Sequence, residues 1–242
     1  MAAFDDAKAL LLHAAAELPK IRKAYDDSLH SKTINSVLLV EIKNFVENLR
    51  SSLDFAAHGL HDRNCGGATG KSKIYFPYAI ATQSRSDFAN SGRINACIPG
   101  LPAARPDIEA ALLEMQHFGT KGYKWLPSFM DLTNENKHQR LTPQVRKESK
   151  ELRISGPGGA GIALGPGAGI SLGKGASISI GGAHIPGGQT FDANNPPVVH
   201  GGRVEIITWV SFHFDSNNQQ VLPFIETAFA GVSDIVNTLE KM

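Results

Sequence analysis

The sequence predicts an α+β protein: a helix-dominated N-terminal bundle, a glycine-rich element of short strands, one long strand and a C-terminal helix. Two observations predict this class. Apolar residues recur at helical spacing in the N-terminal part and again near the end. Between these regions, alternating β-branched residues accompany 15 of the 24 glycines, in Gly156–Gly202. We therefore expect a helical bundle over residues 1–150, a glycine-rich β element over 151–215, and a helix over 216–242 that packs back on the bundle.

The composition is that of a globular protein without a global excess of charge. Hydrophobic residues make up 42% of the 242, and 24 basic side chains face 23 acidic ones, for a formal net charge of +1. This balance excludes a basic field over the whole surface, so an RNA partner would need a local patch. The glycines follow no Gly-X-Y period, which excludes collagen.

The N-terminus and the cysteines favour the cytoplasm. Asp5 and Asp6 stand where a signal peptide needs basic residues, and no apolar run reaches the ~20 residues that span a bilayer. Cys65 and Cys97 are too few for a disulfide framework, which favours free thiols in a reducing compartment. The histidines lack metal-ligand spacing. We expect a cytoplasmic protein with no metal, no cofactor and no membrane partner.

Helical periodicity predicts four helices in the bundle. They span about residues 3–29, 33–62, 106–118 and 123–140. Pro19 is expected to kink or split the first helix, because it lacks the N–H that the helix ladder uses. Ile74–Tyr78 is apolar but contains Pro77, which limits it to an edge strand or an extended packing segment. We expect irregular chain from there to Arg105, and a polar linker over Thr142–Lys150.

An internal repeat of eight residues marks the glycine-rich element. Three octads, GIALGPGA, GISLGKGA and SISIGGAH, occupy residues 161–184 and repeat their apolar pairs in register. Alternation within each octad predicts a short strand and the glycines predict turns, so either three hairpin-linked strands or a small coiled ribbon forms. Arg203–Asp215 is the strongest strand of the chain, and we expect it to pair with Leu152–Ser155 or with the ribbon.

A polar stripe lies beside the apolar face of the second helix. It consists of Glu47, Arg50, Asp54, His58 and His61, within an arc of about 80°. Arg50 could hold a phosphate there, and a histidine could move a proton, since the pKa of histidine lies near neutrality. The alternative is structural: Glu47–Arg50 and Arg50–Asp54 ion pairs on a solvated face or against another helix.

Three motifs resemble an uncharacterised family of bacterial proteins. They are Asn48-Leu-Arg-Ser-Ser-Leu-Asp54, Ile74-Tyr-Phe-Pro77 and Leu132-Thr-Asn-Glu-Asn-Lys-His138, which match the family's pattern NLRSALDH…FP…L..N.DKH in order and spacing. This family is similar to the HEPN helical domains. The resemblance implies a helical domain that pairs two protomers. In HEPN ribonucleases an Arg holds the scissile phosphate of RNA, and a His four to six residues later serves in metal-free acid–base cleavage.

Carried over by position, the resemblance assigns the phosphate-holding role to Arg50 and the acid before the histidine position to Asp54. The histidine position itself is Phe55, which can neither take nor give a proton. His58 lies nearly one turn further on, about 4.5 Å along the axis, and is the candidate substitute. His138, in the third motif, either joins the site or buttresses the bundle.

Two functions compete on this evidence. The first is a non-catalytic binding or structural module that assembles as a homodimer, which Phe55 and the near-neutral charge favour. The second is a HEPN-type metal-independent ribonuclease, a toxin or phage-defence effector, acting on RNA through Arg50 and His58 with His138 as a further candidate. Assembly through the glycine-rich ribbon is a third hypothesis.

Overall fold

The computed structural model describes residues 2–31, 36–66, 73–138 and 144–242. It has a mixed α+β fold, as the sequence predicts. The chain divides into two compact units, a helical unit (residues 1–145 and 213–242) and a β unit (residues 146–212). Within the described ranges, no helix combines the length and the apolar character that crossing a membrane requires.

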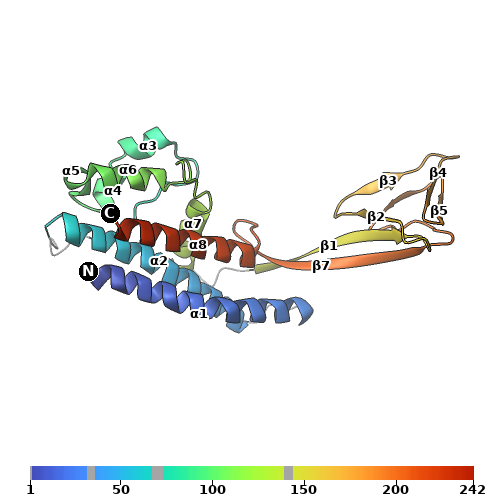
Figure 1. The fold of residues 1–242 in the computed structure, drawn as a ribbon, viewed down its shortest axis with the longest axis horizontal. Helices are drawn as coiled ribbons and strands as arrows, with labels where there is room; N and C mark the ends of the chain where they lie inside the picture. The colour runs from blue at the N-terminus through green and yellow to red at the C-terminus, as the bar shows by residue number, and fades with distance from the viewer. Residues whose placement is uncertain (1, 32–35, 67–72, 139–143) are drawn as a thin grey trace. The chain divides into compact units, whose positions relative to one another are not determined.

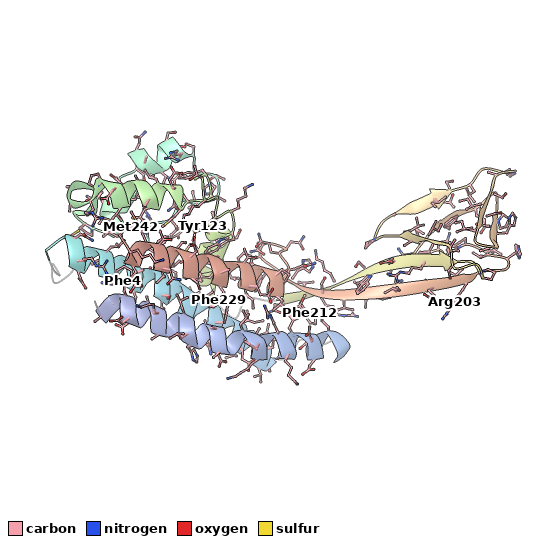
Figure 2. All side chains as sticks on the ribbon, in the orientation of Figure 1. Phe4, Tyr123, Arg203, Phe212, Phe229 and Met242 are labelled. Carbon is pink, nitrogen blue, oxygen red and sulfur yellow. The ribbon has the colours of Figure 1, made fainter. Side chains whose placement is uncertain are left out.

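Three long helices form the core of the helical unit. They are α1 (Ala2–Ser31), α2 (Ser36–Asn64) and α8 (Val221–Glu240). The three pack against one another side by side (Figure 1). Phe229, labelled on α8 in Figure 2, has its ring centre 6.2 Å from that of Phe45 on α2. Because apolar residues recur every three or four positions, each helix buries one stripe against the others.

Pro19 does not split α1, which continues through it. The interior proline costs about 3 kcal/mol. Leu18 and Ile21 beside it are 8% and 1% exposed, and burying such side chains stabilises by about 1.5–3 kcal/mol each, which offsets the loss. Ser31 and Thr33 precede the second helix, and either residue type can cap a helix N-terminus, but both side chains lie outside the described part of the chain.

Short helices replace the irregular chain expected before Arg105. They are α3 (Arg85–Asn90), α4 (Arg93–Cys97) and α5 (Leu101–Ala104), which lie together with α6 (Pro106–Glu114) in Figure 1. Ser84 and Asp87 form a capping box at the start of α3. Helices this short contain too few turns to show a periodicity, so the pattern missed them. The helix α7 (Leu126–His138) completes the unit.

A three-stranded sheet forms the base of the β unit. In it β1 (Gln144–Ser155) lies between β2 (Gly161–Leu164) and β7 (Arg203–Phe214). The long strand thus pairs with the strand that contains Leu152–Ser155, one of the two expected partners. The polar linker expected over Thr142–Lys150 is wrong from Gln144 onward, because β1 already begins there. That half of β1 is almost entirely polar, so it shows no alternation of apolar residues.

The three octads do not form a row of strands linked to one another by hairpins. The strand of the first octad, β2, pairs with β1. The second octad contains β3 (Gly169–Ser171), which pairs with β6 (Thr190–Asp192), and the third contains β4 (Ser177–Ile180), which pairs with β5 (Ala183–Pro186). No octad strand pairs with another octad strand among the described residues, so the hairpin alternative is wrong.

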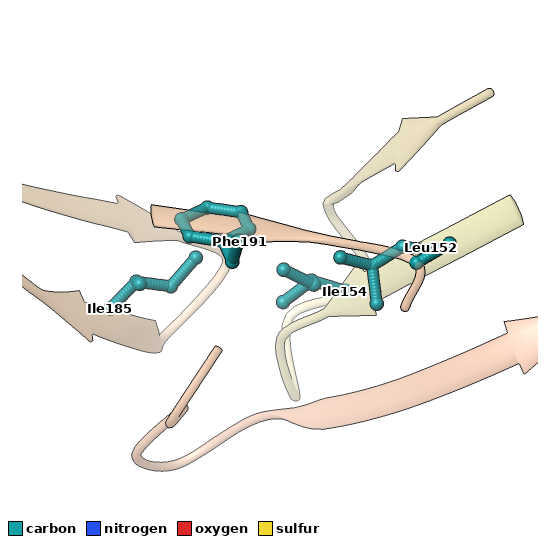
Figure 3. Packing of buried hydrophobic residues seen from close by; sticks show 5 residues of the cluster. Leu152, Ile154, Ile185 and Phe191 are labelled. Carbon is teal, nitrogen blue, oxygen red and sulfur yellow. The ribbon is translucent and has the colours of Figure 1, made fainter. Parts of the chain in front are cut away.

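Apolar residues of all three octads pack on one small core. The core consists of Leu152, Ile154, Ile185, Phe191 and Ala193, four of which Figure 3 labels. The octad residues packed against it are Ile162, Leu164, Ile170, Leu172 and Ile178. The eight-residue period therefore delivers one apolar side chain or pair to the same interior at each repeat.

Close backbone approaches explain part of the glycine excess. A Cβ added at Gly187 would lie 2.0 Å from the carbonyl oxygen of Ala176, and one at Gly156 would lie 2.2 Å from that of Gly181. Backbone atoms cannot rotate away as a side chain can, so these positions accept only glycine.

Candidate functional site

The three motifs that carry the family resemblance meet in the helical unit. We call their meeting point the motif cluster: Arg50 and Asp54 on α2, Phe76 and Tyr78 in the extended segment after it, and Met130 and Asn134 on α7. Within it, the contact between Arg50 and Met130 joins residues 80 positions apart in the chain.

Arg50 occupies the centre of the motif cluster and is 7% exposed. Its Nε donates to Asp54 Oδ2 at 3.2 Å, and its Nη1 donates to the sulfur of Met130. Its guanidinium carbon lies 5.3 Å from the centre of the Tyr78 ring. The salt bridge to Asp54, the contact with the Met130 sulfur and the face of the Tyr78 ring together hold the guanidinium in place. Arginine favours such surroundings because its guanidinium is planar and stacks on aromatic faces.

Asp54 connects α2 to the extended segment that follows it. Its Oδ1 accepts a hydrogen bond from the Phe76 N–H at 2.9 Å. The fully buried Gln116 bonds the next residues, accepting from the Ala79 N–H at 2.9 Å and donating to the Pro77 carbonyl at 3.2 Å. These side chains satisfy backbone groups that a neighbouring strand would otherwise satisfy, so the segment packs in extended form without joining a sheet.

The ion pairs of the polar stripe follow the structural alternative in part. Arg50 and Asp54 form the expected i,i+4 pair. Glu47, however, pairs with Lys43 at 3.0 Å, so the expected Glu47–Arg50 pair is wrong. The two acids lie on opposite sides of Arg50 along the helix, and the one that also bonds the extended segment is its partner.

His58 and His61 lie two turns or more beyond Arg50 on α2. His58 is half-buried and lies two turns along α2, about 12 Å from Arg50 on the axis. His61 is 2% exposed and turned into the fold. Phe55, at the position where the resemblance implies a histidine, is 37% exposed. His138 is the last residue of α7, and its side chain lies outside the described part of the chain.

A second arginine reaches the motif cluster from α4. The guanidinium carbon of Arg93 lies 5.7 Å from the centre of the Tyr78 ring, which therefore faces both Arg93 and Arg50. Asn134 donates to the Tyr78 hydroxyl at 3.1 Å, so this motif residue acts as a buttress between α7 and the extended segment. No signal in the sequence connected Tyr78, Arg93 or Gln116 with the motifs, because each contact crosses from one element to another.

The cluster offers no reactive thiol. Cys97 is 9% exposed, and burial raises the pKa of its thiol although Arg93 acts in the opposite direction. A thiol in such surroundings stays protonated near neutral pH and is a poor nucleophile. Nor do the described residues gather three or more histidine, cysteine or acidic side chains in a group that could hold a metal ion.

No family model, curated protein or solved structure matches this chain. Function therefore has to be argued from the chemistry of the site.

Proposed function

We propose that this chain is a non-catalytic binding and assembly module that acts as a homodimer. The observation that carries the proposal is the state of Arg50. A phosphate-holding arginine needs guanidinium N–H groups directed at its ligand, whereas Nε of Arg50 donates to Asp54, Nη1 donates to Met130, and the residue is 7% exposed. The arginine thus serves to join α2, α7 and the extended segment.

The positions of the candidate proton donors agree with this proposal. Phe55 occupies the place of the expected acid–base histidine and carries no exchangeable proton. His58 would have to act on a phosphate held about 12 Å away along the same helix, whereas acid–base groups act at hydrogen-bond distance. Dimerisation would not shorten the distance between Arg50 and His58 of the same protomer.

The β unit offers the surface for assembly. β7 is an edge strand of its sheet, and a bridge between His213 and Gln220 lies at its end. Ile206 and Trp209 on this strand are 46% and 53% exposed. Unpaired peptide groups with apolar neighbours favour pairing with another strand, and in a symmetric dimer the same strand of a second copy supplies it.

An RNA-cleavage assay tests the non-catalytic part of the proposal. We expect no cleavage of a fluorescent single-stranded RNA by the wild-type chain. Arg50→Lys and His58→Ala are compared with His13→Ala, which removes an exposed histidine on α1. Cleavage by the wild type that disappears in the first two variants and persists in the third would establish the ribonuclease alternative.

Light scattering on the protein as it elutes from a size-exclusion column measures its mass and so tests whether it forms a dimer. We expect twice the chain mass of 25.9 kDa at micromolar concentration. Ile206→Lys places a charge on the edge strand and should yield the monomer mass, whereas Val198→Lys, at a side chain 60% exposed outside the strands, should not. A wild-type monomer, or a dimer indifferent to Ile206→Lys, would overturn assembly along β7.

A further inference from the structure

A pocket of about 440 Å³ opens beside the motif cluster, between α4 and the chain that follows Tyr78. Its volume lies in the range of small-molecule sites. Its lining includes Tyr78, Gln83 and Arg93, which carry polar groups, and Ile80 and Ala96, which are apolar. Ile80 is 56% exposed, so the pocket presents an apolar surface next to a cation.

The charge around the pocket is positive. Arg50 and Arg93 both face the Tyr78 ring, and Asp54 pairs with Arg50. Arg93 is exposed and forms no ion pair with a described carboxylate, and no acidic side chain among the described residues lines the pocket. A guanidinium on an aromatic face is held in orientation while its N–H edge stays free for an anion.

Two further residues that line the pocket carry hydrogen-bond donors. The Tyr78 hydroxyl accepts a hydrogen bond from Asn134, so its own hydrogen can be donated to a ligand. The Gln83 side chain provides an amide N–H₂ group. The Ser91 hydroxyl is used within the protein, donating to the Phe88 carbonyl and accepting from the Arg93 N–H, which holds the start of α4.

We propose that this pocket binds a phosphate monoester with an apolar organic group. Three donor groups match the three terminal oxygens of such a phosphate, whose double negative charge suits the positive surroundings. The apolar group would cover Ile80 and Ala96, and the volume exceeds what inorganic phosphate alone would fill. The inference rests on the proposed function, because it assigns the helical unit a bound ligand and no reaction.

Phenyl phosphate is the probe, and its binding to the full chain is measured by calorimetry at low ionic strength. We expect it to bind at least tenfold more tightly than inorganic phosphate, which lacks the apolar group, and than benzoate, which carries a single charge. Arg93→Ala should weaken binding about tenfold or more, as expected for loss of a charged hydrogen bond. Arg93 is exposed, so this change spares the core.

Arg85→Ala is the matched control. It removes the same charge from the neighbouring helix α3, where Arg85 already pairs with Glu114, and should change affinity by less than twofold. If Arg93→Ala and wild type bind phenyl phosphate equally, or if phenyl phosphate and inorganic phosphate bind equally, the proposed phosphate-monoester site is wrong. The proposed function is unaffected by either result. Release of phenol during the titration would instead contradict the non-catalytic function and leave the pocket standing.

Discussion

Replacing Asp54 by Asn should destabilise the helical unit by about 2–4 kcal/mol. The Asp54 side chain is 18% exposed and that of Arg50 is 8% exposed, so the pair is largely removed from water. Loss of one partner of a buried pair costs about 3–5 kcal/mol, since the other charge stays buried without compensation. We reduce this figure because Asp54 keeps some access to solvent.

Asp54→Ala should cost about 1–3 kcal/mol more than Asp54→Asn. The asparagine oxygen can still accept the hydrogen bond from the Phe76 N–H, whereas alanine leaves that N–H buried without a partner. Combining Asp54→Asn with Arg50→Met removes both charges, and this double variant should be more stable than Asp54→Asn alone.

Urea unfolding followed by circular dichroism at 222 nm measures these free energies, because the helices dominate that signal. The control is Asp107→Asn, which breaks the surface pair with Arg105; Asp107 is 55% exposed, and we expect a change within about 1 kcal/mol. An Asp54→Asn variant as stable as this control would contradict the predicted loss, since it would mean that the Arg50 charge is solvated in the native protein.

Three further predictions concern packing and acid stability. Gly59→Ala places a Cβ 2.4 Å from the Phe4 ring. The overpacking costs about 1–3 kcal/mol, which should exceed the gain of about 1 kcal/mol in helix propensity, so we expect a net loss of stability. Greater stability of the variant in urea would contradict this. Gly187→Ala should speed hydrogen exchange in the β unit and leave that of α1 unchanged, because the added Cβ meets backbone; uniform protection would contradict this. Arg85, together with the Thr120 N–H, lowers the pKa of Glu114 to about 2, so the stability it contributes is present above pH 4.5 and lost as pH falls toward 2. The difference between wild type and Glu114→Gln should therefore shrink across that range, and a constant difference would count against the pair.

Much of the fold followed from patterns that are local in the chain. The helices α1, α2 and α8 contain five or more turns, so their apolar spacing repeats often enough to be recognised. The helices α3, α4 and α5 and the polar half of β1 lack such a repeat and were missed. The octad period predicted strands but not their partners, because pairing depends on residues far along the chain.

The candidate site divides in the same way. Sequence patterns alone predicted the α+β class and the Arg50–Asp54 pair, because residues four apart on a helix lie side by side whatever surrounds them. The folded arrangement was needed to see that Met130 and Tyr78 enclose Arg50, that Gln116 holds the extended segment, and that a pocket forms beside Arg93. The burial of Arg50 and the hydrogen-bond donors left free at the pocket result from contacts between distant segments of the chain. The local spacing of residues does not predict such contacts.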